Sequence, residues 1–345
     1  MVVKSRRDAI NRVCTQKSNR ILNFELFVSL VPSPHYPLSP EGAPSSPIPN
    51  PQSLFLTPNL SMSTNLMIRG RCFQWGQQTY LMGVLNVTPD SFSDGGEFNS
   101  TATAVAQAQA LVAAGADIVD VGGQSTRPGA EQITVAEEME RVVPIVKALR
   151  SGMDIPISVD TTRADVAKAS VAAGADIIND ISGGTFDSEM LPTVASLGVP
   201  IVLMHIRGNP QTMQQQTDYQ DLMAEIYNFL AKQIATAIAV GIDQQKIIID
   251  PGIGFAKNYE QNLEIFRRLR SLRVLNCPIL VGPSRKSFIG RILNQPDPKA
   301  RVWGTAAACC AAIFNGADIL RVHDVKEMRD VSFVADALFR QTTQD

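Results

Sequence analysis

Oxygen-bearing side chains gather in one short stretch that follows a run of apolar residues. Residues 80–87 have the continuous apolar character of a buried strand, and a loop of small, polar and acidic residues follows them. Asn86, Asp90 and Asp94 offer only oxygen ligands, which suit a hard cation such as Mg²⁺ shared with a phosphorylated substrate. The alternative is a solvated loop of Asp and Ser that caps the next helix, and this stretch alone does not separate the two interpretations.

Seven of eight short apolar runs end in a polar or charged group. In chain order, the eight ends are Asn86, 122–129, 160–162, 179–184, 204–205, 250–255, 282–287 and 321–324. Any one end has a structural alternative, because Asp160 could cap the helix after it and His205 could be a packed histidine at the rim. The whole set, however, points to a binding site.

The types of these residues fit a flat, nitrogen-rich heterocycle. Carboxylate and amide edges can accept hydrogen bonds from amino and ring N–H groups, a lysine can donate to a carbonyl and a ring nitrogen, and apolar side chains can cover the ring faces. The residues for these roles are Asp160, Asn179, Asp250, Lys286, Met204 and Phe255. Arg321 and His323, with hydroxyl groups from 122–129, suit phosphate oxygens. Together these residues predict a heterocycle with an attached phosphate or pyrophosphate, and Mg²⁺.

The elements that would carry these groups alternate between two kinds. Short runs rich in Val and Ile lie at 80–87, 118–122, 157–160, 177–180, 201–204, 246–250, 279–282 and 319–322. Helical segments lie between them, for example at 101–114, 135–150, 163–173, 218–240 and 258–272. Near-continuous apolar strands interleaved with helices indicate a parallel sheet that is covered on both faces.

The phrase Gly-Ala-Asp-Ile recurs three times, starting at Gly115, Gly174 and Gly316. Each repeat joins a helix end, a glycine suited to the left-handed C-cap and the start of a strand. Eight such units over roughly 260 residues predict an α/β fold of the TIM (β/α)8 barrel type, with its chemistry at the C-terminal ends of the strands. A doubly wound open sheet is the alternative, but the G-x-G-x-x-G motif that it would favour after the first strand is missing.

The first 61 residues differ in composition from the rest of the chain. They begin with basic residues, and 32–58 is dense in Pro and Ser, with few apolar groups to order the chain. We expect a disordered extension at 1–61, although an organelle transit peptide and a start site assigned too early remain open. Turn signals at 67–78 predict a small hairpin, so 62–345 would form one barrel domain with this hairpin at its start.

Composition argues against several classes of partner. A formal net charge of −2 does not suit a nucleic-acid-binding protein, which would carry a strong basic patch. The apolar run at 302–314 is too short to span a membrane. Five cysteines without CxxC spacing favour buried thiols in a reducing compartment over a disulfide framework or a zinc site. We therefore expect small-molecule substrates, and neither nucleic acid nor a membrane.

Eight motifs, in this order along the chain, resemble those of the dihydropteroate synthase family. They are MGVLNVTPDSFSDGG, GGQSTRPGA, ISVDTTRADV, NDISGG, LMHIRGNPQTMQ, IIDPGIGFAK, VGPSRKSFIG and ILRVHDV. The resemblance extends over 82–325 and implies a transferase of folate biosynthesis. It would condense 6-hydroxymethyl-7,8-dihydropterin pyrophosphate with p-aminobenzoate to give 7,8-dihydropteroate and pyrophosphate, with Mg²⁺ as cofactor. We also expect a cytoplasmic homodimer that sulfonamides inhibit.

The resemblance implies specific roles for residues of this sequence. The pterin pocket would be lined by Asp160, Asn179, Met204, Asp250, Phe255, Gly282 and Lys286. Mg²⁺ and pyrophosphate would be held by Asn86, Arg321 and His323. The residues that would close over pyrophosphate and aminobenzoate are Asp90, Phe92, Asp94, Thr126, Arg127, Pro128, Lys286 and Ser287. Because 88–96 and 124–129 hold few apolar residues, we expect ligand contacts to order both loops.

The implied mechanism needs no protein nucleophile, since the enzyme stabilises charge on the departing pyrophosphate and positions the arylamine. The sequence departs from the family at Gln124, where many members carry Glu, and this concerns local hydrogen bonds of the loop. A corrinoid-dependent methyltetrahydrofolate methyltransferase would share the barrel but has no use for the Thr-Arg-Pro and Ser-Arg-Lys-Ser loops. A non-catalytic pterin-binding protein would have lost some of the charged or amide groups, which are present as Asn86, Lys286, Arg321 and His323.

Overall fold

A closed barrel of eight parallel strands forms the body of the protein in the computed structural model, which describes residues 65–87, 97–127 and 129–340. The strands are β3 (Tyr80–Asn86), β4 (Ile118–Gly122), β5 (Ile157–Asp160), β6 (Ile177–Asp180), β7 (Ile201–Met204), β8 (Ile247–Asp250), β9 (Leu280–Val281) and β10 (Ile319–Val322). Their order in the sheet is β8-β7-β6-β5-β4-β3-β10-β9. A parallel bridge between Ile249 and Ile279 joins the two ends of the sheet. The predicted TIM barrel is therefore confirmed.

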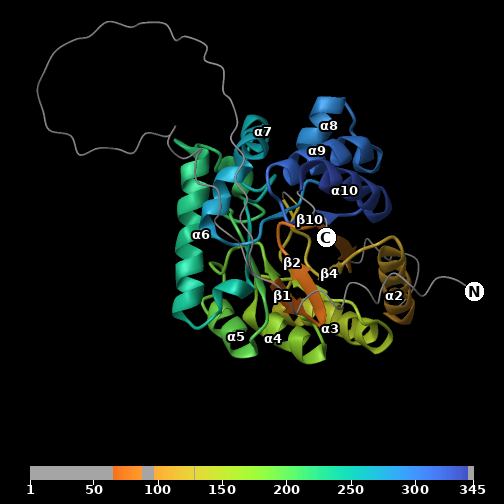
Figure 1. The fold of residues 1–345 in the computed structure, drawn as a ribbon. Coiled ribbons are helices and arrows are strands. Elements are labelled where there is room, and N and C mark those ends of the chain that lie inside the picture. Colours follow the sequence, from red (N-terminus) through yellow and green to blue (C-terminus); the bar gives the residue numbers. More distant parts are fainter. Residues whose placement is uncertain (1–64, 88–96, 128, 341–345) are drawn as a thin grey trace, which may run out of the picture. The chain divides into compact units, whose positions relative to one another are not determined.

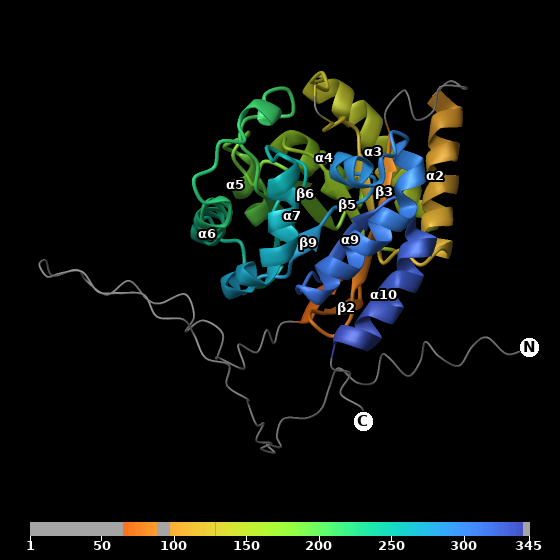
Figure 2. The same ribbon diagram turned by 90° about the horizontal axis from the view of Figure 1, so that it is seen from above.

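Helices surround these strands, as Figures 1 and 2 show. The helices are α2 (Glu97–Ala113), α3 (Val135–Gly152), α4 (Ala164–Ala173), α5 (Met190–Leu197), α6 (Leu222–Ala239), α7 (Tyr259–Arg268), α8 (Ser287–Leu293), α9 (Val302–Phe314) and α10 (Val325–Phe339). A large buried apolar core lies between them and the strands. Among the described residues, no helix has the length and apolar character needed to cross a membrane.

Several element boundaries differ from the prediction because of capping and 3₁₀ turns. The strand predicted at 246–250 begins at Ile247, since the Asp243 side chain accepts a hydrogen bond from Gln245 N at 2.9 Å and starts a 3₁₀ turn. The helix predicted at 258–272 is α7, which Asn258 caps, followed by a 3₁₀ segment at Leu269–Leu275. The bounds of β4, β5, β6, β7 and β10 are those predicted.

The predicted hairpin closes the N-terminal end of the barrel. It consists of β1 (Asn65–Ile68) and β2 (Arg71–Gln74), joined by a turn in which Arg69 and Gly70 have φ values of 49° and 69°. One buried cluster contains Leu66, Ile68, Phe73, Trp75, Tyr80, Met82, Ile118, Ile177, Val202, Ile248, Leu280 and Ile319. Most of the strand residues in this cluster lie at the strand starts, so the hairpin covers that end and leaves the other for a site.

The three Gly-Ala-Asp-Ile repeats form one structure three times at this closed end. Gly115, Gly174 and Gly316 have φ values of 103°, 114° and 94°, the left-handed conformation predicted at these helix ends, with Gly174 as the C-cap of α4. The aspartate of each repeat accepts a hydrogen bond from a backbone N–H on the neighbouring strand, at 2.7, 2.9 and 3.0 Å for Asp117, Asp176 and Asp318. Each repeat therefore ties the end of a helix to the pairing of two strands.

Candidate functional site

A single arginine on β10 joins two carboxylates inside the C-terminal end of the barrel. Arg321 Nε donates to Asp120 Oδ2 at 2.6 Å, and Arg321 Nη2 donates to Asp160 Oδ2 at 2.8 Å. Asn179 Nδ2 donates to the same oxygen of Asp120 at 3.3 Å. Strands β4, β5, β6 and β10 thus bring four polar side chains together, and the two carboxylates and the amide are buried.

Burial sets the charge state of this cluster. It raises the pKa of Asp160 to about 7; Arg321 opposes this rise, and Asp120 adds to it. Burial alone would lower the pKa of Arg321, but Asp120 and Asp160 hold it above its usual value. Asp120 Oδ1 is buried and has no hydrogen-bond partner among the described residues. Because an unpaired buried acceptor is unfavourable, this oxygen is available to an N–H group of a ligand.

Asp250 and Lys286 form the second charged part of the site. Asp250, at the end of β8, accepts a hydrogen bond from Gly252 N at 2.7 Å. Burial raises the pKa of Asp250 to about 6, while the bond from Gly252 and the ammonium groups of Lys286 and Lys257 oppose the rise. Lys286 Nζ lies 4.3 Å from the centroid of the Phe255 ring, and burial lowers the pKa of Lys286 to about 8. The end of β8 therefore carries a carboxylate with two cations near it.

An apolar cluster forms one wall of this end of the barrel. It consists of Ile181, Met204, Ile206, Met213 and Ala256, with Phe255 packed against it. Met204 pairs with Asp250 in the register of β7 and β8, so the apolar wall adjoins the carboxylate. Gly282 follows β9 and faces the stem of Arg321, since a Cβ at Gly282 would lie 3.8 Å from Arg321 Cβ. The structure thus brings the apolar cluster and the Asp250 carboxylate side by side.

His323 lies two residues after Arg321 and contacts the loop that follows β9. Its Nδ1 atom is 3.0 Å from Ser284 Oγ, which also accepts a hydrogen bond from His323 N at 3.2 Å. Burial, together with the charges of Arg321 and Arg285, lowers the pKa of His323 to about 3. In this neighbourhood His323 is neutral, so Arg321 supplies the permanent positive charge.

The backbone that carries Lys286 and Ser287 is held by two arginines. Arg285 has a φ of 61° and binds Asp324 through Nε at 3.1 Å and Nη2 at 2.5 Å. Arg301 Nη1 donates to Arg285 O at 2.9 Å and to Lys286 O at 3.3 Å. Ser287 is the first residue of α8. These bonds tie the loop to Asp324, which precedes α10, and to Arg301, which precedes α9.

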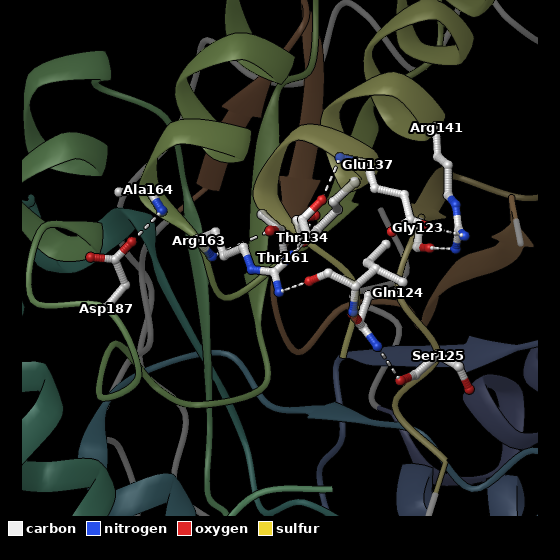
Figure 3. A network of polar contacts seen from close by, with 12 residues as sticks. Gly123, Gln124, Ser125, Thr134, Glu137, Arg141, Thr161, Arg163, Ala164 and Asp187 are labelled. Carbon is white, nitrogen blue, oxygen red and sulfur yellow. Dashed lines mark hydrogen bonds and ion pairs between the residues drawn. The ribbon is translucent and has the colours of Figure 1, made fainter. Parts of the chain in front are cut away.

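The Gln124 side chain bonds to backbone groups further along its own loop, residues 123–134, which we call the second loop (Figure 3). Its Nε2 atom donates to Glu131 O at 2.7 Å, and its Oε1 atom accepts from Ile133 N at 2.9 Å. Arg141 Nη1 donates to Gly123 O at 3.1 Å. The role of Gln124 is therefore local to the loop, as the sequence suggested.

Arg163 connects this loop to α3 and to the strand ends (Figure 3). Its Nη1 atom donates to Glu138 Oε2 at 2.6 Å and to Thr134 O at 3.1 Å, and burial raises the pKa of Glu138. Gly129 N donates to Pro210 O at 3.0 Å, which joins the loop to the segment after β7. Protein contacts thus reach the described part of this loop, and the expectation that ligand contacts order it stays a prediction.

The remaining predicted loop residues differ in where they lie. Thr126 lines a cavity of about 30 Å³ together with Asp160 and Glu138, which places it beside the Arg321 cluster. Arg127 is exposed, and its carbonyl accepts a hydrogen bond from Ala130 N at 3.1 Å. The predicted residues that lie outside the described part of the chain are Asp90, Phe92, Asp94 and Pro128.

Asn86, the predicted metal ligand, ends β3 at the same end of the barrel. A Cβ at Gly122 would lie 3.9 Å from both Asn86 Oδ1 and Asp160 Oδ2, so both oxygens face the same small space. Oxygen donors of this kind fit Mg²⁺, which commonly takes one or two protein ligands beside phosphate oxygens and water. Within the described ranges, no three His, Cys, Asp or Glu side chains are grouped so as to hold a metal ion.

Comparison with known proteins decides the family. The model of the "Pterin binding enzyme" family matches residues 82–323. A dihydropteroate synthase from Synechocystis sp. is 60% identical to this chain over 268 residues, which are 78% of this chain and 93% of that protein. The chain belongs to the dihydropteroate synthase family. The resemblance of the eight motifs is thereby confirmed.

Solved structures of dihydropteroate synthases have the same fold as this chain. The Yersinia pestis enzyme in a sulfonamide drug complex has a TM-score of 0.75 and 42% identity, covering 80% of this chain and 99% of that one. The Xanthomonas albilineans enzyme in complex with 7,8-dihydropteroate has a TM-score of 0.72 and 38% identity, covering 80% of this chain and 98% of that one. The barrel described here is thus the barrel of the family.

Two polar groups of this dihydropteroate synthase site were missed in the sequence. Asp120 lies in the middle of β4 and not at its end, and its only signal is a lone carboxylate among apolar neighbours. Lys257 lies in a loop where lysine is usually solvated, yet only 2% of it is exposed. Both sit within the charged neighbourhood of Asp160 and Asp250.

Proposed function

We propose that this protein condenses 6-hydroxymethyl-7,8-dihydropterin pyrophosphate with p-aminobenzoate, giving 7,8-dihydropteroate and pyrophosphate. The observation that carries this proposal is the convergence of Asp160, Asn179 and Asp250 at one end of the barrel, in a member of the dihydropteroate synthase family. The relative that was solved with 7,8-dihydropteroate supports the assigned product.

The pterin ring system fits the polar edge and apolar wall of this site. Asp250 accepts hydrogen bonds from the exocyclic amino group and a ring N–H, and Lys286 donates to the ring carbonyl and a ring nitrogen. Asp120 Oδ1, which lacks a partner among the described residues, offers a further acceptor. Met204 and Phe255 cover the faces of the ring. The apolar side chains cover the ring, and the polar groups fix its orientation and select it.

The reaction is a substitution at the exocyclic methylene carbon of the pterin. The electron pair of the C–O bond leaves with pyrophosphate while the dihydropterin ring donates electron density to the carbon. The amino nitrogen of p-aminobenzoate then forms the C–N bond and loses a proton. Arg321, kept charged by Asp120 and Asp160, stabilises the negative charge on the leaving group. The other protein groups hold the two reactants in line.

The pyrophosphate group fits the side of the site formed by β3 and β10. Arg321 has two N–H groups committed to carboxylates, and His323 and Ser284 supply further polar groups beside it. Asn86 would hold Mg²⁺ through its carboxamide oxygen, and the cation, when bound, neutralises charge on pyrophosphate oxygens.

We assign p-aminobenzoate, beside the pyrophosphate, to the loop that begins α8, to the second loop and to the first loop at 88–96. The residues assigned here are Lys286, Ser287, Thr126 and Arg127, together with Asp90, Phe92, Asp94 and Pro128, which lie outside the described residues. By the same assignment sulfonamides bind here, as supported by the drug complex of the Yersinia pestis relative.

We also propose that the protein is a homodimer that pairs through the outer faces of α9 and α10. Trp303 is 75% exposed, Phe333 63% and Leu338 69%. Phe314 and Phe339 pack edge to face across the two helices, with centroids 5.1 Å apart. An exposed apolar face of this kind typically marks a protein–protein interface.

We propose a cytoplasmic or similarly reducing location. Cys277 and Cys309 are buried, and burial raises the pKa of both thiols. Buried thiols of this kind are inert and persist in reducing compartments.

The direct test is a coupling assay with dihydropterin pyrophosphate, p-aminobenzoate and Mg²⁺, which follows dihydropteroate as it forms. We expect turnover that needs both substrates. A folded protein that binds the pterin but forms no dihydropteroate would contradict the proposed function.

A further inference from the structure

Lys257 is a buried cation that the reaction described above does not use. It follows Phe255 and Ala256 on the loop between β8 and α7, and lysine is almost never this deeply buried without partners. Its Nζ atom lies 2.8 Å from Phe255 O, 3.0 Å from His205 Nδ1 and 3.5 Å from His205 O. The partners of this ammonium group are thus two carbonyl oxygens and one imidazole nitrogen.

The backbone beside Lys257 adopts a conformation that needs support. Ala256 is buried and has a φ of 50°, in the left-handed region that residues other than glycine seldom adopt. Asn262 of α7 donates through Nδ2 to Lys257 O at 3.2 Å and accepts from Gly254 N at 2.7 Å. Conformations of this kind persist where surrounding contacts fix them, and they cluster at functional sites.

Lys257 joins the two loops that form the wall of the pterin pocket. His205 follows Met204 at the end of β7, and its backbone N–H donates to Asp250 O at 3.0 Å. Gly252 lies so close to His205 that a Cβ atom on Gly252 would be 2.0 Å from His205 O. With the loops in such close contact, one ammonium group reaches His205 on the first and Phe255 on the second.

The charges around Lys257 favour the same arrangement. Burial lowers the pKa of His205 to about 2, so the imidazole is neutral and its Nδ1 atom can accept a hydrogen bond from an ammonium group. Burial lowers the pKa of Lys257 to about 7, and Asp250 opposes this. In return, the charge of Lys257 favours the ionised form of Asp250.

We propose that Lys257 is a positioning residue for the pterin pocket. Its ammonium group binds His205 and the Phe255 carbonyl, and so holds the loops after β7 and β8 around Asp250. The proposal rests on the proposed function, because it takes Asp250, Met204 and Phe255 as pterin-binding residues. Lys257 acts through these residues, and its loss should weaken pterin binding while leaving p-aminobenzoate recognition unchanged.

The test compares the full-length wild-type protein with Lys257→Met, which removes the ammonium group and keeps most of the side-chain volume. We expect KM for dihydropterin pyrophosphate to rise about tenfold or more, and KM for p-aminobenzoate to stay within about twofold. The matched control is Lys246→Met. Lys246 lies just before β8, at the opposite end of the strand from Lys257, and its Nζ atom also donates to a backbone carbonyl, Gly198 O, at 2.7 Å. That control should leave both KM values unchanged.

A second variant tests the bond between Lys257 and His205 by changing His205. His205→Phe keeps the ring that packs on Phe229, with centroids 5.0 Å apart, but removes the Nδ1 acceptor. If the two side chains act as one unit, the double variant should raise the pterin KM no more than Lys257→Met alone. Additive effects of the two substitutions would overturn the proposed link between them.

The outcomes separate this proposal from the proposed function. A wild-type protein that does not turn over would remove the function itself. If the wild type turns over and Lys257→Met lowers the melting temperature with both KM values unchanged, Lys257 is only structural and the proposal is overturned. Should Lys257→Met not fold, Lys257→Gln decides, because an unchanged pterin KM overturns the proposal and a selective rise supports it.

Discussion

Aspartates line both ends of this barrel, but the two sets have different partners. At the N-terminal end, Asp117, Asp176 and Asp318 each accept a backbone N–H from a neighbouring strand. Each also faces an arginine from the outer layer, as in the 2.5 Å pair of Asp176 with Arg150. Every such carboxylate therefore has partners supplied by the fold, and its role is to stabilise the barrel.

At the C-terminal end, the carboxylates converge on one another. Asp120 and Asp160 share Arg321, and Asp120 Oδ1 has no partner among the described residues. Asp250 receives a 2.7 Å bond from Gly252 N and faces ammonium groups that form no ion pair with it within the described residues. Asp120 Oδ1 is thus an acceptor that the described residues leave for a ligand.

The comparison teaches that a raised pKa is not enough to recognise a site. Burial raises the pKa of Asp117 and Asp318 at the closed end, just as it raises that of Asp160 and Asp250 at the open end. Even at the open end, both carboxylate oxygens of Asp180 accept hydrogen bonds from Ser182 and Gly184, so this aspartate holds a loop. Among the described aspartates, Asp120 has a buried carboxylate oxygen without a hydrogen-bond partner, and this oxygen distinguishes the open end from the closed one.

The largest difference between the two ends should appear with isosteric substitutions. Asp160→Asn keeps an acceptor for Arg321 but removes the charge, so we expect kcat/KM to fall about 10- to 100-fold with little change in the free energy of unfolding. Steady-state kinetics and urea unfolding measure the two quantities. Unchanged kinetics with a large loss of stability would place Asp160 with the structural carboxylates.

The pH dependence of pterin binding should show the raised pKa of Asp250. The carboxylate is ionised above about pH 6 and becomes protonated as the pH falls below it, losing charge-assisted hydrogen bonds to the pterin. Affinity should therefore fall by up to about tenfold per pH unit below that value. Titrations from pH 5 to pH 8 test this, and Asp250→Asn should flatten the profile. An affinity that rises in acid would contradict the assignment.

Substituting an aspartate at the closed end should lower stability and leave substrate binding unchanged. Asp176→Asn weakens the pair with Arg150 and the bond from Ile157 N, so we expect the free energy of unfolding to fall by about 1–3 kcal/mol. Both KM values should stay at the wild-type level in the folded protein. A selective change in one KM would show that the two ends are coupled.

The smallest effect is expected from removal of the N-terminal extension. Residues 1–61 are rich in Pro and Ser, and the first strand of the hairpin begins at Asn65. A chain that starts at Met62 should keep turnover within about twofold of the full chain. A well-folded truncated chain with much lower turnover would make the extension part of the functional protein.

How far the sequence predicts this molecule depends on whether the signal is local. The strands β4 to β7 were predicted to the residue because apolar runs end there in Gly, Asp or Met followed by polar loops. The boundary at Ile247 was missed because a side-chain cap at Asp243 starts a 3₁₀ turn. Local patterns thus give the elements, and capping shifts their ends.

The candidate site was predicted only where its residues stand at strand ends. Asp120 was missed because its partner Arg321 is 201 positions away, and barrel closure alone brings them together. Lys257 was missed because only the contact between two loops buries it. The second loop was expected to depend on ligands because few of its residues are apolar. Its anchors Arg163 and Arg141 come from other elements, so no local pattern announces them.

The central claim is that the open end of the barrel binds the pterin through Asp250. The most direct measurement is a calorimetric titration of dihydropterin pyrophosphate into the wild type and into Asp250→Ala. Removing one partner of a buried charged group should weaken binding by about 2–5 kcal/mol, which is a loss of tens- to thousands-fold in affinity. Wild-type affinity in a folded Asp250→Ala protein would contradict the claim and leave Asp250 as a structural cap of the loop.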